Sequence, residues 1–335
     1  MLQSDLNGRY RSVDFVKGIC IVFILITHYM WSDSERLKLL FPFYIDMAVP
    51  IFMIISGYVH AKSFTKKNIA TIGEAYTLKN TIGKIIRYTV PFVLAFVFEE
   101  VAYSAIGVVS HKPFQMLLIF LGGGFGPGSY YFPIMIQFVF WFPIIFFIIK
   151  KYDFTGLIIC GAINVTYEIL KLAYGMNEGC YRVLIFRYTL LIAYGIYLTK
   201  GNSRRKRISI ICEVIGITYI VLVNYFGIKP VITEFWSGTS VIACLYIIPI
   251  SSFLIFNKAH SRLVEFIGKA SYDIYLVQMV YYVGAGAMYK VVGNRVLQLL
   301  INILVCLVAG MVFYIIESSI TKALNTKVSK YLKTS

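Results

Sequence analysis

The segment SVDFVKGICIVFILITHYMW, residues 12–31, decides the fold class of this chain. Its apolar run is long enough to cross a bilayer as one helix, because about 20 residues span the hydrocarbon layer. The segment contains ionisable residues, and no small-residue cleavage site follows it. We therefore interpret it as a retained helix rather than a cleaved signal peptide.

Similar segments recur along the whole chain. Of its 335 residues, 59% are hydrophobic and only 14% are charged, and the mean hydropathy is +0.74. This composition lies outside the range of soluble domains. The sequence predicts an all-α, polytopic transmembrane bundle of about ten helices, at residues 12–31, 42–61, 88–109, 129–149, 154–174, 183–199, 208–226, 238–256, 271–290 and 297–317.

The basic residues favour one orientation of these helices. Lys and Arg number 32 against 16 Asp and Glu, which gives a net charge of +16. With a cytoplasmic N-terminus, 23 of the 32 basic residues fall on the inside, as expected for cytoplasmic loops. We expect both termini in the cytoplasm and a multi-pass protein of the plasma (inner) membrane. A nucleic-acid partner is not expected, since its binding would need basic residues clustered on a polar surface.

The loops suggest a single integral-membrane domain over residues 1–335. Residues 62–87 form a cytoplasmic loop that could hold an interfacial helix, and residues 318–335 form a short basic cytoplasmic tail. The six cysteines lack CxxC spacing, so neither a disulfide framework nor a zinc site is expected. The glycine-rich segment 122–128 is either a flexible turn or, although no GK[ST] follows, a phosphate cradle.

The first segment carries the densest set of ionisable residues. Lys17 and His28 are eleven residues apart, so they share a helical face about 16 Å apart along the axis, and Asp14 lies near the same stripe. Two interpretations stay open. Lys17 could snorkel and pair with Asp14 while His28 lies at the interface, or the helix could place a proton-transfer residue a cofactor arm away from a cation.

Five elements of the sequence point to a known family. They are the Asp, basic-Gly and His pattern within residues 11–28, the FFxISGF-like segment 46–58, the basic-basic-Pro segment 84–91, the GxxSYxIYLxH-like segment 268–276, and Glu317 at the end of the last span. Together and in this order, they resemble the membrane-bound acyltransferase 3 family along the whole chain.

The chain departs from the family pattern at three places. Lys17 stands where the family usually has Arg. Gln278 replaces a His, which argues against a second catalytic histidine. Residues 130–132, Tyr-Tyr-Phe, replace the Trp-rich HLWF start of the fourth span, which suggests a different acceptor.

The resemblance implies an integral-membrane O-acyltransferase. It would move an acyl group, usually acetyl, from cytoplasmic acyl-CoA to a hydroxyl of a carbohydrate or other cell-envelope acceptor. Acetyl-CoA or another acyl-CoA would be the co-substrate, and no metal is expected. The implied residues are His28, Asp14 and Glu317 for catalysis, Lys17, Lys84, Arg87 and Ser56 for the donor, and Tyr131, Gln137, Tyr272 and Tyr275 for the acceptor.

Each of these polar residues also has a structural interpretation. Those assigned to the acceptor, and Ser56, could make ordinary hydrogen bonds between helices. Glu317 could form an ion pair with Arg87 or Lys17. A second function, a transporter or flippase of a small or lipid-linked substrate, draws support from the Glu99-Glu100 pair, but the sequence shows no inverted repeat.

Overall fold

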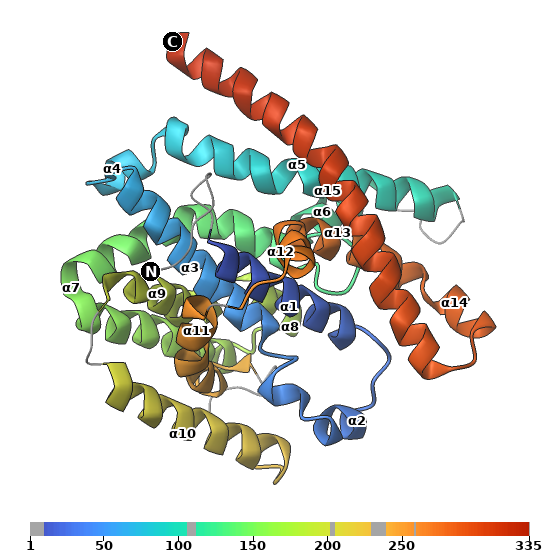
Figure 1. Ribbon diagram of the computed structural model, residues 1–335, viewed down its shortest axis with the longest axis horizontal. Helices are drawn as coiled ribbons and strands as arrows, with labels where there is room; N and C mark the ends of the chain where they lie inside the picture. The colour runs from blue at the N-terminus through green and yellow to red at the C-terminus, as the bar shows by residue number, and fades with distance from the viewer. Residues whose placement is uncertain (1–9, 106–111, 202–204, 229–238, 258, 335) are drawn as a thin grey trace. The chain divides into compact units, whose positions relative to one another are not determined.

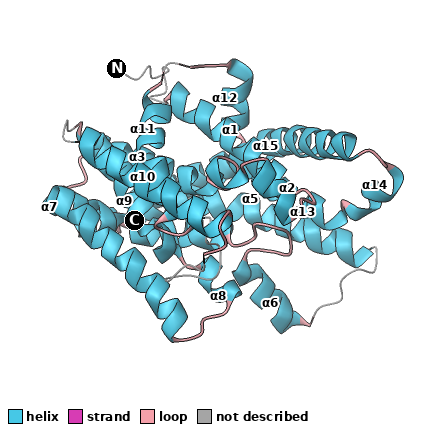
Figure 2. Ribbon diagram, turned by 90° about the horizontal axis from the view of Figure 1, so that it is seen from below, coloured by secondary structure: helices cyan, strands magenta, loops and turns pink. Residues whose placement is uncertain are grey.

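The computed structural model describes all residues except 1–9, 106–111, 202–204, 229–238, 258 and 335. The structure is all-helical, with 83% of residues in helices and no strand among the described residues (Figures 1 and 2). The all-α prediction is therefore confirmed.

The chain divides into two compact units. Unit 1 comprises residues 1–72 and 141–269, and unit 2 comprises residues 73–140 and 270–335. The boundary at residue 141 falls inside one long helix, so both units contain part of it.

Unit 1 contains most of the short helices. In chain order they are α1 (Arg11–Thr27), α2 (Asp33–Lys38), η1 (Phe41–Phe43), α3 (Ala48–Lys66), the second part of α7 (Tyr131–Ala173), α8 (Glu178–Val183), η2 (Ile185–Tyr188), α9 (Thr189–Tyr197), η3 (Leu198–Lys200), α10 (Arg205–Asn224), η5 (Ala243–Tyr246), α11 (Ile247–Phe256) and α12 (Arg262–Lys269).

Glycines allow two helix pairs of unit 1 to approach closely. A Cβ atom at position 57 of α3 would lie 2.3 Å from the carbonyl oxygen of Ile192 on α9. A Cβ atom at position 18 of α1 would lie 2.2 Å from the carbonyl oxygen of Val264 on α12. Both glycines belong to the family-like segments, and in this structure they are contact points between helices.

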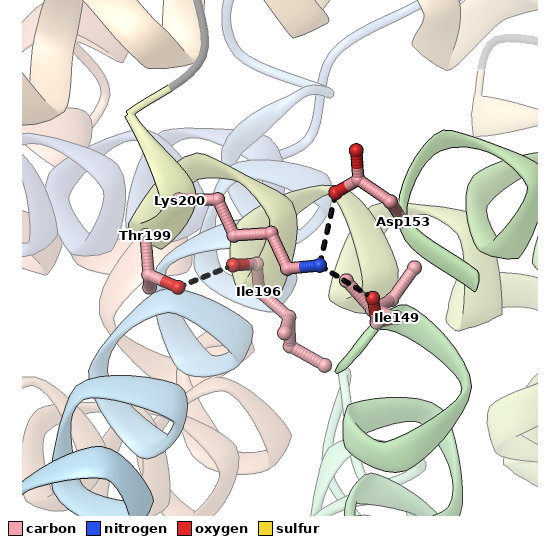
Figure 3. A network of polar contacts seen from close by, with 5 residues as sticks. All are labelled: Ile149, Asp153, Ile196, Thr199 and Lys200. Carbon is pink, nitrogen blue, oxygen red and sulfur yellow. Dashed lines mark hydrogen bonds and ion pairs between the residues drawn. The ribbon is translucent and has the colours of Figure 1, made fainter. Parts of the chain in front are cut away.

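A lysine holds the turn inside α7. Asp153 has a left-handed φ of 51°, so α7 consists of two helices that meet at a kink. The Lys200 ammonium donates to the Ile149 carbonyl at 2.7 Å and to the Asp153 carboxylate at 2.9 Å (Figure 3). Lys200 thus satisfies a carbonyl that the first helix leaves without an intrahelical partner.

Unit 2 contains fewer helices, of which two have 28 and 40 residues. In chain order its helices are α4 (Ile72–Ala75), α5 (Leu78–Ala105), α6 (Pro113–Gly122), the first part of α7, α13 (Ser271–Gly284), α14 (Gly286–Val291) and α15 (Arg295–Thr334). Within this unit α13 packs against both α5 and α15, and α5 packs against α15.

Four helical segments of the described residues are long and apolar enough to cross a membrane: residues 41–66, 72–104, 131–173 and 295–332. This finding supports a membrane protein. The helical character of the predicted bundle is confirmed, whereas the count of about ten membrane-spanning helices is not. The kink at Asp153 separates the expected segments 129–149 and 154–174. The expected segment 183–199 is divided among η2, α9 and η3, and the expected boundaries Val109 and Gly238 lie outside the described residues.

Candidate functional site

Three predicted site residues lie on or directly after α1 in unit 1. The helix is continuous from Arg11 to Thr27, so the three-turn spacing from Lys17 towards His28 is retained. The Lys17 ammonium lies 3.7 Å from Oδ1 of Asp14, and the Asp14 side chain is only 6% exposed. The pairing that the sequence left open is thus present. It holds Lys17 beside a buried carboxylate.

His28 is the C-cap residue of α1 and lies among cations. Its backbone remains helical, with φ −86° and ψ −1°, and its side chain is half-buried. Arg36 and Arg182 both interact electrostatically with the imidazole. The Arg36 guanidinium is itself held by the Asp46 carboxylate at 2.5 Å. The end of α1 therefore combines a histidine with two positive charges.

Ser56 lies on α3, where a second histidine follows one turn later. The His60 Nδ1 atom is 2.9 Å from the Ser56 carbonyl oxygen, and the His60 ring packs against Phe142. The backbone of Ser56 is thus engaged within α3. These contacts give His60 a structural role, and the sequence analysis had not considered it.

In unit 2, Glu317 belongs to a buried carboxyl pair. Glu317 on α15 and Asp273 on α13 are 6% and 4% exposed, and the two carboxyls interact electrostatically. The Thr321 hydroxyl donates to Glu317 Oε2 at 2.7 Å. Arg87 on α5 interacts electrostatically with both carboxyls.

Three of the four predicted acceptor residues form part of a row of tyrosines in unit 2. The ring centroids are 5.1 Å apart for Tyr131 and Tyr275, 6.0 Å for Tyr275 and Tyr272, and 5.7 Å for Tyr272 and Tyr88. The Tyr272 hydroxyl donates to the Tyr88 carbonyl at 2.9 Å. This row joins α7, α13 and α5.

The remaining predicted residues of unit 2 are Gln137 on α7 and Lys84 and Arg87 on α5. The Gln137 amide donates to the Pro133 carbonyl of its own helix at 3.1 Å, so this hydrogen bond lies within α7 and not between helices. Lys84 lies on α5 one turn before Arg87. Its side chain is half-buried, whereas that of Arg87 is exposed.

Several residues that lie beside the predicted ones were not among the candidates from the sequence. Arg36 and Arg182 belong to the minority of basic residues that the predicted topology places on the outside. Because basic residues usually concentrate in cytoplasmic loops, this exception could have marked them as candidate functional residues. Asp273 is an acidic residue inside an apolar segment, which is itself a signal of function or pairing. No group of three or more His, Cys, Asp or Glu side chains that could hold a metal ion occurs among the described residues.

Comparison with known proteins assigns the chain to a family. Neither a curated protein nor a solved structure matches the chain. The model of the acyltransferase 3 family, described as an acyltransferase domain, matches residues 10–316, which include α1 and the tyrosine row and end one residue before Glu317. Because this match covers nearly the whole sequence, the chain belongs to the acyltransferase 3 family.

Proposed function

We propose that this acyltransferase transfers an acetyl group from cytoplasmic acetyl-CoA to a hydroxyl of a carbohydrate or other cell-envelope acceptor. The observation that carries the proposal is the unbroken helix α1, which presents Lys17 near its start and ends at His28, within the region that the family model matches. The family supports acyl transfer, and the donor, the acceptor and the inner-membrane location are our inference.

His28 acts as the general base in this proposal. The neutral imidazole takes the proton of the acceptor hydroxyl while the hydroxyl oxygen attacks the thioester carbonyl carbon. Collapse of the tetrahedral intermediate breaks the carbon–sulfur bond and releases the CoA thiolate, which takes up a proton. Transient acylation of His28, followed by transfer to the hydroxyl, gives the same products.

The two arginines near His28 fit this chemistry. Negative charge develops on the carbonyl oxygen as the intermediate forms, and fixed cations stabilise such charge. Arg36 and Arg182 both act electrostatically on the His28 position, and the Asp46 carboxylate fixes Arg36. We assign them to charge stabilisation.

The cations nearer the start of α1 and of α5 are assigned to the donor. In unit 1, Lys17 would bind a phosphate group of CoA, with Asp14 orienting its ammonium and Ser56 as a further polar contact. In unit 2, Lys84 and Arg87 would also bind phosphate, and Glu317 with Asp273 would orient Arg87. Tyr131, Tyr272, Tyr275 and Gln137 would contact the acceptor.

The transporter hypothesis gains no support from its main residue. Glu99 is 1% exposed, and its Oε2 atom accepts a hydrogen bond from the backbone N–H of Phe125 at 3.4 Å. The Glu99 carboxylate therefore has a structural role in holding the loop. The family match in turn favours an acyltransferase over a transporter.

Membranes that contain the chain provide the test. They should move radiolabel from [acetyl-¹⁴C]acetyl-CoA to envelope carbohydrate as an ester that mild alkali releases, and His28→Ala membranes should not. Export of a labelled substrate without ester formation would favour the transporter.

A further inference from the structure

Three side chains of unit 2 hold the glycine-rich loop between α6 and α7. The Tyr275 hydroxyl donates to the Gly128 carbonyl at 2.7 Å, and the Gln278 amide donates to the Pro127 carbonyl at 2.9 Å. At the other end of the loop, Glu99 accepts from the Phe125 N–H at 3.4 Å. We call Glu99, Tyr275 and Gln278 the loop clamp.

The loop also packs closely against α13. A Cβ atom at position 126 would lie 2.2 Å from the carbonyl oxygen of Met279. Gly124 has a φ of 104°, in the left-handed region that favours glycine. The glycines thus permit a backbone contact that the clamp then fixes.

The position of the contact explains why polar side chains are needed. Tyr275, Gln278 and Met279 lie in the middle of α13, inside the expected span 271–290. At the membrane depth that the sequence predicts for this span, non-helical backbone has no water to bind, so the protein must supply its hydrogen-bond partners. Gln278 is completely buried and supplies one of them.

The clamp acts directly on the start of α7. The Gly128 carbonyl that accepts the Tyr275 hydroxyl also accepts the backbone N–H of Tyr131, at 3.0 Å. The Tyr131 ring then packs against the Tyr275 ring. A change in the loop backbone must therefore move Tyr131.

We propose that Gln278 and Glu99 are positioning residues that fix the loop backbone and thereby hold Tyr131 in place for the acceptor. The acceptor part of this inference rests on the proposed function, whereas the holding of the loop does not. It also gives Gln278 a role as a hydrogen-bond donor at the position where the family pattern has a histidine. A histidine there could donate a ring N–H to the same carbonyl.

The experiment compares Gln278→Leu with Gln278→His in the purified full-length protein. Leucine has a similar size but cannot donate, so the apparent KM for isolated envelope polysaccharide, used as the acceptor, should rise about fivefold, as expected for one lost hydrogen bond, while the KM for acetyl-CoA stays unchanged. Histidine should restore the acceptor KM to within about twofold of wild type. Hydrogen exchange of the 122–131 peptide should accelerate in Gln278→Leu and not in Gln278→His.

Two further variants secure the interpretation. Tyr281→Phe removes another α13 hydroxyl, whose partner is Asn302 on α15 rather than the loop, and it should change neither readout. Glu99→Gln keeps an oxygen acceptor for the Phe125 N–H and Glu99→Leu does not, so only the leucine variant should accelerate exchange. This pair replaces the Gln278 pair if Gln278→Leu does not fold.

Wild-type exchange in folded Gln278→Leu and Glu99→Leu would overturn the clamp. Accelerated exchange with an unchanged acceptor KM would overturn the positioning of Tyr131. If wild-type protein transfers no acyl group, the proposed function fails, and the exchange experiment still decides whether the clamp exists.

Discussion

The ammonium of Lys17 lies 3.7 Å from the carboxylate of Asp14, one turn earlier on α1. If Lys17 also binds a CoA phosphate, Lys17→Ala removes a charge-assisted hydrogen bond worth about 1.5–3 kcal/mol. The dissociation constant for CoA should rise about tenfold or more, as measured by isothermal titration, and Lys17→Arg should retain most of the affinity. Equal CoA affinity in folded wild type and Lys17→Ala would leave the Asp14 pair as the only role of Lys17.

His28 should be essential for turnover. A lost general base typically lowers the rate by about 10²–10⁴, so His28→Ala should lose acyl transfer by that factor while its thermal unfolding stays close to wild type. His60→Gln is the matched control, because His60 packs inside unit 1 and contacts its own helix. Turnover near wild type in folded His28→Ala would reduce His28 to a structural residue.

The kink of α7 gives a test of membrane orientation. Since α7 turns at Asp153, a reporter fused after Lys151 should read cytoplasmic, and one fused near Asn177, beyond the second half of the helix, should read external. The opposite reading at either position would reject the charge-based topology.

Two interactions of Lys200 at the Asp153 kink can be tested separately: its hydrogen bond to the Ile149 carbonyl and its ion pair with Asp153. Lys200→Met loses both interactions and should lower stability by about 1–3 kcal/mol, whereas Asp153→Asn loses only a half-exposed ion pair worth less than about 1 kcal/mol. Thermal unfolding in detergent should rank the two variants in this order. Equal losses would mean that the Ile149 carbonyl bond contributes nothing.

The α3 and α9 contact should not accept a methyl group. Gly57→Ala would place a Cβ atom against the Ile192 carbonyl, and such overpacking costs about 1–3 kcal/mol or more. Gly73→Ala meets no atom within 4 Å and should unfold at nearly the wild-type temperature. A stable, fully folded Gly57→Ala protein would contradict this packing.

The sequence predicts local features of this protein better than its contacts. The apolar period and the ionisable stripe of α1 are properties of one helix, so the continuous helix up to His28 followed from them. The partnership of Asp273 with Glu317 joins residues 44 positions apart, and the loop clamp joins Glu99 and Gln278 through a third segment. Such contacts depend on tertiary packing, which helical periodicity does not encode.

Helix boundaries failed for a related reason. Hydropathy alone placed the start of the third span at Tyr88, but α5 begins at Leu78, because polar residues such as Lys84 and Arg87 continue a helix as readily as apolar ones. The segment 183–199 is mostly apolar, yet its helical residues divide among the 3₁₀ helix η2, the α-helix α9 and the 3₁₀ helix η3. Apolar composition predicts which segments lipid can surround, and it does not predict where the type of helix changes.

The length of α15 has a mechanical consequence. Its 40 residues extend about 60 Å, and a hydrocarbon layer of about 30 Å takes in only about 40 Å of helix even at a tilt of about 40°. Residues 318–334 contain four lysines and no acidic residue, so this is the end that leaves the lipid. The lysines are therefore spaced along a stiff arm about 20 Å long, which points in one direction instead of sweeping the volume that a loose tail would explore.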